Sequence, residues 1–302
     1  DRFYGTNDAN RFPSSYSRFV RGSMPYEECC MAYRAYKLFL NVNSVMNSDT
    51  MFSRRVFEIL ASSTHVLSTP SEGMENMLPF GVTVVDSLND AQQAITHLLA
   101  NDEERNKSAH LGYRHVMNNH TYSHRVGDML DKLGIQSEIP LNNPLVSLVT
   151  CTNRPDMISN IMHNFNHQTW KNKEIIIVID CEDQDYRKVE KVLGNQGNVT
   201  LHKVQIGLSL GHCFNKGMEL SKGDYIAKFD DDDLYGPNYI EDQLLSFKYT
   251  DADIVGKLCT FMYHEKSERT YLRFPNNRHK FGDLVLGPTF FFKRKVADNI
   301  KM

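Results

Sequence analysis

The amino-acid sequence predicts an α/β protein with two Rossmann-like units, each built on a parallel sheet. Its length of 302 residues suggests about two domains. On both sides of a segment rich in proline and asparagine, apolar strands alternate with amphipathic helices. This pattern favours parallel strands joined by helical crossovers. Hydrophobic residues make up 41% of the chain, which is enough for two hydrophobic cores.

The first unit, residues 1–136, is predicted from short apolar runs and from apolar residues at helical spacing. Its strands are expected at 37–43, 65–68 and 82–85, and its helices at 52–62, 89–99 and 102–133. Asn89 or Ser87 is expected to cap the helix at 89–99. The long helical stretch at 102–133 is expected to break near Asn118 and Asn119.

The linker is predicted at 137–144, and the second unit, residues 145–302, has a doubly wound pattern. Its strands are expected at 145–150, 174–179, 199–203 and 224–229, and its helices at 157–168, 186–193 and 211–220. In such sheets, ligands bind beyond the carboxyl ends of the strands. Asp180 follows the second of these strands and Asp230–Asp233 follow the fourth. These carboxylates are therefore expected at one edge of the sheet.

The run of four aspartates, Asp230–Asp233, is the most unusual local feature of the chain. At an effective dielectric near 20, each close pair of carboxylates costs roughly 4 kcal/mol. A cleft at the end of a sheet tolerates this repulsion when a cation binds the oxygens, and Mg²⁺ and Mn²⁺ prefer carboxylate and phosphate oxygens. The alternative is a solvated acidic turn or a helix N-cap.

Composition and charge exclude several classes of function. A formal net charge of −3 argues against a nucleic-acid-binding surface. Six cysteines without CxxC spacing predict reduced thiols in a cytoplasmic protein. No apolar run approaches the roughly 20 residues of a transmembrane helix, which leaves peripheral membrane association open. The chain begins with neither an initiator methionine nor a signal peptide, so we expect it to start within a longer protein.

Several motifs occur in a fixed order in the second unit. They are Thr152-Asn153-Arg154-Pro155, Glu174–Asp180, the helix start Leu210–Gly217, and Gly223-Asp224-Tyr225-Ile226 followed by Asp230–Asp233. Together they resemble the nucleotide-sugar-binding half of family 2 glycosyltransferases, which have the GT-A fold. The resemblance covers about residues 145–302. It implies transfer of a sugar from a nucleoside diphosphate, UDP in particular, to a glycan or other hydroxyl acceptor.

The resemblance implies a metal site of Mn²⁺ or Mg²⁺ in the acidic run. Asp230 and Asp232 form the D-x-D element. Asp232 is the first choice for the direct metal ligand, and Asp230 or Asp231 would lie nearer the ribose or a metal-bound water. A divalent ion on the phosphates neutralises charge as the glycosidic C–O bond breaks. Asp233 is expected to cap the turn or helix that follows.

The nucleotide would lie beside the other motifs. By the same resemblance, Asp180 would accept a hydrogen bond from the base, the imide N–H of uracil, and Thr152 and Arg154 would line the same pocket. Asn215 would contact the donor. For Asp180 the structural alternative is a turn-forming aspartate, and for Asn215 it is a helix cap.

One departure from the family pattern concerns catalysis. Inverting family members supply a carboxylate general base, in a Glu-Asp pair downstream of a strand that resembles Gly287–Arg294. Asp283 and Asp298 lack the expected neighbour or position. We therefore expect the base to lie beyond Met302, and we expect these 302 residues to bind donor and metal but to transfer sugar poorly or not at all.

The first unit resembles a different group. Arg55–Ala61, His65–Ser68 and His120–Arg125 are similar to the donor-binding half of GT-B glycosyltransferases, particularly spore-maturation-protein-like members. The resemblance implies that Glu58 holds the donor ribose and that Ser71-Glu72-Gly73 face the diphosphate. The wider family's E-x7-E pattern requires an acid at position 50, where Thr50 stands. A salt-bridged Glu58 without a catalytic role is the alternative.

Two other functions are compatible with the sequence. The first is a module that binds nucleotide sugar without turnover, because the general base is not identified. The second is a nucleotidyltransferase, which also combines an α/β sheet with acidic metal ligands. That class favours a glycine-rich, basic phosphate loop after the first strand, and residues 150–155 contain no glycine. A glycosyltransferase is therefore the leading prediction.

Overall fold

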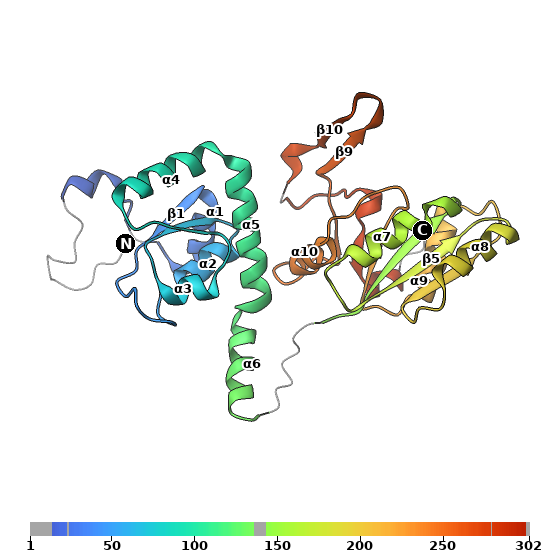
Figure 1. Cartoon of the computed structure of the whole chain (residues 1–302), viewed down its shortest axis with the longest axis horizontal. Helices are drawn as coiled ribbons and strands as arrows, with labels where there is room; N and C mark the ends of the chain where they lie inside the picture. Colours follow the sequence, from blue (N-terminus) through green and yellow to red (C-terminus); the bar gives the residue numbers. More distant parts are fainter. Residues whose placement is uncertain (1–13, 23, 136–142, 279, 300–302) are drawn as a thin grey trace. The chain divides into compact units, whose positions relative to one another are not determined.

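The computed structural model describes residues 14–22, 24–135, 143–278 and 280–299 of the chain. It divides the chain into two compact units, Asp1–Leu141 and Asn142–Met302. Each unit contains its own sheet with helices packed against it (Figure 1). The α/β fold class predicted from the sequence is confirmed for both units. Most of the predicted linker lies outside the described residues.

The first unit contains a parallel sheet of three strands in the order β1-β2-β3. The strands are β1 (Leu38–Asn41), β2 (His65–Ser68) and β3 (Val82–Val84), all at the predicted positions. The helices are α1 (Cys29–Ala35), α2 (Arg55–Ala61), α3 (Glu72–Met77), α4 (Leu88–Ala100), α5 (Asp102–Asn119) and α6 (Tyr122–Lys132), with 3-10 turns at Ser14–Phe19 and Tyr26–Glu28. The sequence analysis did not predict α1 and α3.

Local hydrogen bonds explain where the helices of this unit begin and end. The Ser87 hydroxyl accepts the Asp90 N–H at 3.1 Å, so Ser87, and not Asn89, caps α4. The predicted break in the long helical stretch falls between Asn119 and Tyr122. There Thr121 and His124 form a capping box that starts α6.

The second unit contains a sheet of six strands in the order β6-β5-β4-β7-β11-β8. The strands are β4 (Val146–Thr152), β5 (Lys173–Ile179), β6 (Val199–Lys203), β7 (Tyr225–Lys228), β8 (Ile254–Val255) and β11 (Phe291–Lys293). β4 pairs in parallel with β5 and β7, β5 pairs in parallel with β6, and β11 is antiparallel to β7 and β8. The helices are α7 (Ile158–His167), α8 (Asp183–Leu193), α9 (Leu210–Leu220), α10 (Tyr239–Ser246) and α11 (Arg294–Ala297), with 3-10 turns at Pro155–Met157, Glu265–Ser267, Pro275–Asn277 and Gly287–Thr289.

Alternate strand residues in the second unit pack on opposite faces of the sheet. Leu148 belongs to the cluster that also buries residues of α7, α8 and α10, whereas its neighbour Val149 packs with Phe214 of α9. The same alternation separates Phe291 from Phe292. Because successive strand residues point to opposite faces, the almost continuous apolar strands form the middle layer of an α/β/α sandwich.

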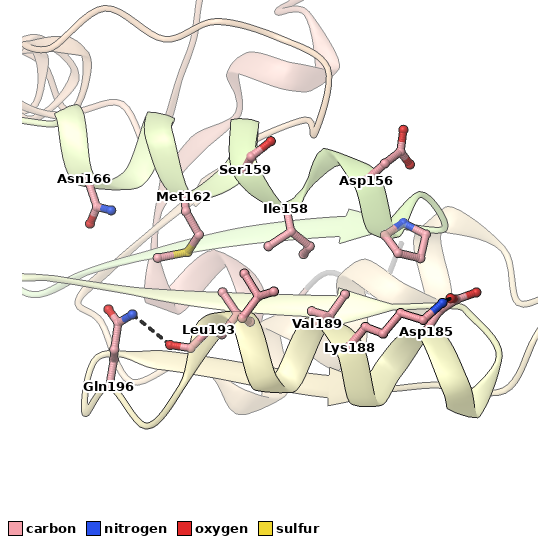
Figure 2. A pocket seen from close by; sticks show the side chains of 12 residues that line it. Asp156, Ile158, Ser159, Met162, Asn166, Asp185, Lys188, Val189, Leu193 and Gln196 are labelled. Atoms are coloured by element: carbon pink, nitrogen blue, oxygen red, sulfur yellow. Dashed lines mark hydrogen bonds and ion pairs between the residues drawn. The ribbon is translucent and has the colours of Figure 1, made fainter.

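The helices α7 and α8 lie side by side on one face of this sheet and leave an open groove (Figure 2). The groove has a volume of about 700 Å³. Ile158 and Met162 line it from α7, and Val189 and Leu193 line it from α8. Its rim includes Pro155 and other residues that follow the end of β4.

An exposed hairpin in the second unit was not predicted from the sequence. Its strands, β9 (Thr260–His264) and β10 (Arg269–Arg273), pair only with each other. Phe261 is exposed on one face and Tyr271 on the other. A strand that buries neither face has no alternation of apolar and polar residues, so the usual sequence signal for a strand was absent.

Two further findings concern the whole described part of the chain. All six cysteines are free in the structure. Among the described residues, no helix combines the length and the hydropathy needed to cross a bilayer.

Replacing Gly217 by alanine is expected to destabilise the second unit by roughly 1–3 kcal/mol, because overpacking strains a closed core. A Cβ on Gly217 would lie 2.3 Å from Cγ1 of Val149, a side chain with no exposed surface. Urea unfolding followed by Trp170 fluorescence measures this loss, since the chain's single tryptophan lies in this unit. Gly197→Ala is the control, because its Cβ would meet nothing within 4 Å. Equal stability of the two variants would contradict the prediction.

Candidate functional site

The candidate site lies at the carboxyl ends of three adjacent parallel strands of the second unit. β4 ends at Thr152, between β5, which ends at Ile179, and β7, which ends at Lys228. The N–H of Asp180 donates to the Thr152 carbonyl at 2.9 Å. The topology therefore places Asp180 and the acidic run on either side of the end of β4.

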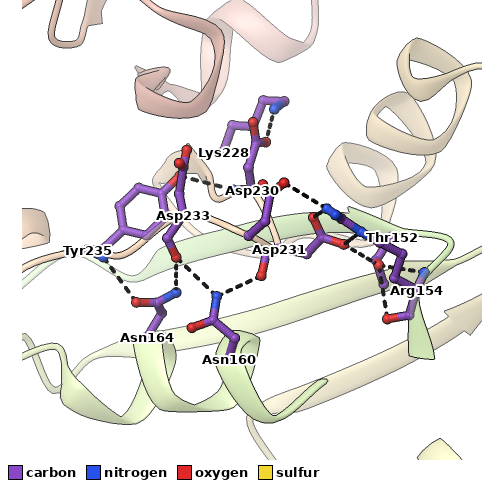
Figure 3. Close-up of polar contacts among 10 residues, drawn as sticks. Thr152, Arg154, Asn160, Asn164, Lys228, Asp230, Asp231, Asp233 and Tyr235 are labelled. Carbon is purple, nitrogen blue, oxygen red and sulfur yellow. Dashed lines mark hydrogen bonds and ion pairs between the residues drawn. The ribbon is translucent and has the colours of Figure 1, made fainter. Parts of the chain in front are cut away.

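Asp231 is held tightly against the end of β4 (Figure 3). Its Oδ2 accepts hydrogen bonds from the Thr152 hydroxyl at 2.5 Å and from Arg154 Nε at 3.1 Å. Its Oδ1 accepts a further bond from Arg154 Nη2. The side chain of Asp231 is only 8% exposed, so these bonds compensate for most of the water that the carboxylate has lost.

Asp232, the next residue, is in a different environment. Its side chain is 57% exposed, and its Oδ2 lies 3.0 Å from Arg154 Nη2. The hydrogen bonds to Asp231, and then those to Asp232, raise the pKa of the Arg154 guanidinium. Asp230 forms an ion pair with Lys228, the last residue of β7. Two protein cations therefore pair with three carboxylates of the run, which leaves one negative charge uncompensated.

The backbone of the acidic run is fixed by two asparagines of α7. Asn164 Nδ2 donates to the Asp233 carbonyl at 2.8 Å, and its Oδ1 accepts the Tyr235 N–H at 3.0 Å. Asn160 Nδ2 donates to the carbonyls of Asp231 at 2.7 Å and Asp233 at 3.1 Å. These four bonds fix the path of the chain after β7.

Asp233 was expected to cap the turn or helix that follows; capping of the helix is wrong, and capping of the turn stays a prediction. The helix that follows, α10, begins at Tyr239 with Asn238 at the N-cap position, which is five residues beyond Asp233 in the chain. Partial burial of the Asp233 carboxylate, followed by the charges of Asp230 and Asp232, raises its pKa. The Asp233 carboxylate is therefore protonated more readily than an ordinary aspartate.

Tyr235 fixes the chain that follows the acidic run. Its ring stacks on Phe229 with centroids 3.7 Å apart. Its hydroxyl accepts the Asp230 N–H at 2.9 Å and donates to the Pro288 carbonyl at 2.7 Å. Burial raises the pKa of Tyr235, so the phenol keeps its proton and can act as this bridge.

The sequence analysis missed the residues that support the acidic run. They are Asn160, Asn164, Lys228 and Tyr235. One signal was available for the asparagines, because residues four apart on a helix lie on the same face, and α7 carries this pair toward the end of β4. For Lys228 and Tyr235 the sequence contains no comparable signal.

Asp180 lies on the β5 side of the site, and Asn215 lies on α9. Asp180 Oδ2 accepts the N–H of Gly207 at 3.0 Å, which orders the loop that leads into α9. Ser209 caps that helix by accepting the His212 N–H. Asn215 is the sixth residue of α9, so the alternative of a helix-capping Asn215 is wrong.

Cys151 is the strand residue between Thr150 and Thr152 at this edge. Burial raises the pKa of its thiol to about 12. The thiol therefore stays protonated near neutral pH, and Cys151 is unsuited to act as a nucleophile.

The chemistry of the acidic run fits a hard divalent cation that is shared with a ligand. Among the described residues, no group of three or more histidine, cysteine, aspartate or glutamate side chains could hold a metal ion alone. A Mg²⁺-type ion at a phosphate site takes one or two protein carboxylates and completes its shell with phosphate and water. Asp232, with its exposed carboxylate, and Asp230 could provide that number of ligands.

The predicted site residues of the first unit have protein partners in this structure. Glu58 accepts the Tyr26 hydroxyl at 2.9 Å and lies 3.0 Å from Arg54 Nε. The N–H groups of Glu72 and Gly73 donate to carbonyls of the loop between β1 and α2, those of Met46 at 3.0 Å and Ser48 at 2.9 Å. The donor-binding role of Glu58 stays a prediction.

Comparison with known proteins gives curated relatives for part of the chain. Over 99 residues the chain is 31% identical to the glucosyl-dolichyl phosphate glucuronosyltransferase of Haloferax volcanii, and the matched region covers 32% of each protein. Over 100 residues it is 29% identical to the putative colanic acid biosynthesis glycosyl transferase WcaA of Escherichia coli, and the matched region covers 32% of this chain and 36% of the relative. The chain thus spans about a third of the length of these two curated relatives.

Solved structures give a weaker likeness. The mannosyltransferase PcManGT from Pyrobaculum calidifontis, in complex with GDP-Man and Mn²⁺, has 15% sequence identity and a TM-score of 0.39, and the match covers 51% of this chain and 46% of that one.

Two family matches cover most of the chain. Residues 2–131 match the family described as glycosyl transferase-like. Residues 147–299, which are just over half of the chain, match glycosyl transferase family 2. The motifs from Thr152 to Asp233 lie within the second match. The chain belongs to glycosyl transferase family 2.

Proposed function

We propose that residues 145–302 bind a nucleotide-diphosphate sugar, a UDP-sugar in particular, together with Mn²⁺ or Mg²⁺, and serve transfer of the sugar to a hydroxyl acceptor. The observation that carries the proposal is the contrast within the acidic run. Asp232 presents an exposed carboxylate, while Asp231 and two asparagines hold the backbone around it. A loop that is held in place and presents the accessible carboxylate of Asp232 is suited to bind a cation that arrives with its phosphates.

Each residue of the site receives a role in this proposal. Asp232 ligates the cation directly, with Asp230 beside it, and the cation neutralises the diphosphate when bound. Asp180 accepts a hydrogen bond from the base, on the other side of β4. Thr152 and Arg154 line the pocket between the cation and the base, and Asp231 holds these two side chains in place. Asn215 is the proposed donor contact on α9.

The acceptor is proposed to be a glycan, in line with synthesis of a cell-surface polysaccharide in the cytoplasm. The name of the colanic acid relative from Escherichia coli supports this class of acceptor.

Calorimetric titration of the chain with UDP-sugars, GDP-mannose and ATP, each with and without Mn²⁺, tests the proposal. We expect Mn²⁺ to strengthen UDP-sugar binding by about tenfold or more, equivalent to about 1.4 kcal/mol. Asp232→Ala is expected to remove this increment. The control is Asp183→Ala, an exposed aspartate that pairs with Lys203, which should retain it. Binding that is indifferent to Mn²⁺, or a preference for ATP, would refute the proposal.

A binding module without turnover is the second candidate. The observation that favours it is the exposure of Asp283 and Asp298, because neither carboxylate is enclosed as a poised general base usually is. Transfer of radiolabelled sugar to a hydroxyl acceptor separates the two candidates. Donor binding without acceptor-dependent transfer would support the binding module for these residues.

A further inference from the structure

Two neighbouring carboxylates share one guanidinium but are held very differently. Asp231 is 8% exposed and receives bonds from both Nε and Nη2 of Arg154 as well as from Thr152. Asp232 is 57% exposed and meets Arg154 through Nη2, at 3.0 Å. The same Nη2 group therefore bridges a buried carboxylate and an exposed one.

We propose that Arg154 is a positioning residue that keeps Asp231 throughout the binding cycle and holds Asp232 only until a divalent cation takes its place. In this arrangement Asp231 is a structural tether and not a metal ligand, and Arg154 acts as a resident counter-ion for Asp232. The inference deepens the proposed function and rests on it for the cation.

The physical reason for the tether is desolvation. A buried carboxylate that loses its cationic partner is left uncompensated, which is far less favourable than the loss of an exposed pair. Planar, bidentate contact of the kind that Arg154 makes with Asp231 is specific to arginine. Thr152 strengthens it, because its hydroxyl accepts the Arg154 N–H at 2.9 Å while it donates to Asp231. The tether thus fastens the acidic loop to the end of β4.

The physical reason for the exchange is that Asp232 loses little when it leaves Arg154. An exposed ion pair is weak and is screened by water and salt. A divalent ion brings twice the charge to the same oxygens, and Arg154 remains compensated by Asp231. The cation is therefore expected to displace Arg154 from Asp232 without loosening the loop.

The first experiment tests the tether without metal or nucleotide. Hydrogen exchange of the backbone amides from Asp230 to Leu234 is compared in the wild type, Asp231→Asn, Arg154→Gln and Asp232→Asn. We expect exchange about fivefold faster or more in Asp231→Asn and in Arg154→Gln, and within about twofold of the wild type in Asp232→Asn. Unchanged exchange in Asp231→Asn would overturn the tether.

The second experiment tests the exchange with Mn²⁺, followed by electron paramagnetic resonance at saturating UDP. Asp231→Asn is expected to weaken Mn²⁺ binding about fivefold, because the released Arg154 pairs fully with Asp232. The double variant Asp231→Asn/Arg154→Gln, which has the same net charge as the wild type, should bind Mn²⁺ at least about threefold more tightly than Asp231→Asn. Asp232→Asn should abolish Mn²⁺ binding.

These outcomes distinguish the inference from simpler readings. If Arg154 has only a structural role, the double variant should bind Mn²⁺ no better than Asp231→Asn does. That result would overturn the proposal that Arg154 and the cation compete for Asp232. If the wild type with UDP takes up no Mn²⁺, the proposed function fails and the displacement of Arg154 fails with it. The hydrogen-exchange result still decides the tether in that case.

Discussion

Replacing Asn164 by alanine is expected to destabilise the second unit by about 3 kcal/mol, because the buried Tyr235 N–H loses its partner, the Asp233 carbonyl keeps only the longer bond from Asn160, and a cavity is left. Asn164 is 2% exposed. Its amide donates to the Asp233 carbonyl and accepts the Tyr235 N–H. Each unsatisfied buried group costs about 1–3 kcal/mol, and the cavity left by the side chain adds to this. The loop that carries Asp232 should lose its fixed position as well.

Urea unfolding monitored by Trp170 fluorescence measures the loss of stability. Asn166→Ala on the same helix is the matched control, because it is exposed and gains the same helix propensity on change to alanine. We expect the control to stay within about 0.5 kcal/mol of the wild type. Calorimetry should show weaker Mn²⁺-dependent UDP binding in Asn164→Ala alone. A variant as stable as the control would show that water replaces the amide.

Acidification from pH 6.5 to pH 4 is expected to destabilise the first unit through His65. Burial, followed by the charge of Arg105, lowers the pKa of His65 to about 4. Glu104 opposes this shift. In the unfolded chain the imidazole titrates near 6.5, so between these values the unfolded state binds the proton and the folded state does not. Stability is therefore full above pH 6.5 and falls as the pH falls, with a total loss on the order of 3 kcal/mol below pH 4.

His65→Gln tests this expectation, since glutamine can still bond the Thr83 hydroxyl that lies 2.8 Å from His65 Nε2. The variant should lose most of the pH dependence between 6.5 and 4. The control is His97→Gln at an exposed histidine of α4, which should retain it. Pulse-labelling hydrogen exchange of residues 65–68 after equilibration in urea provides the measurement, because Trp170 reports on the other unit. An equal slope in the wild type and His65→Gln would contradict the prediction.

The sequence was informative wherever a single strand or helix buries an apolar face. β2 and β6 begin and end at the predicted residues, and the break between α5 and α6 lies where the two asparagines indicated it. The hairpin of β9 and β10 was missed, because exposed strands lack the alternation that burial imposes. α3 was missed for a related reason, since its six residues contain little more than one helical turn.

For the site, the sequence placed Asp180 and the acidic run at one edge of the sheet, but it identified neither the residues that support the run nor the environment of each carboxylate. Strand order alone requires that Asp180 and the acidic run lie beyond neighbouring strands, because the carboxyl ends of parallel strands share one edge. Four identical carboxylates in succession carry no information about burial. Arg154 was expected to face the nucleotide, and in the structure it contacts Asp231 and Asp232.

The sequence by itself therefore determined the α/β class of both units, the family resemblance and the edge of the sheet that carries the acidic run. Only the tertiary structure decided that Asp231 is buried, that Asp232 is exposed, and that Asn164 and Tyr235 fix the loop between them. The physical reason is that strands and helices follow from local patterns of apolar residues. The environment of a charge depends on groups from distant segments, here side chains of α7 and of the end of β4 and the carbonyl of Pro288, which only the folded chain brings together.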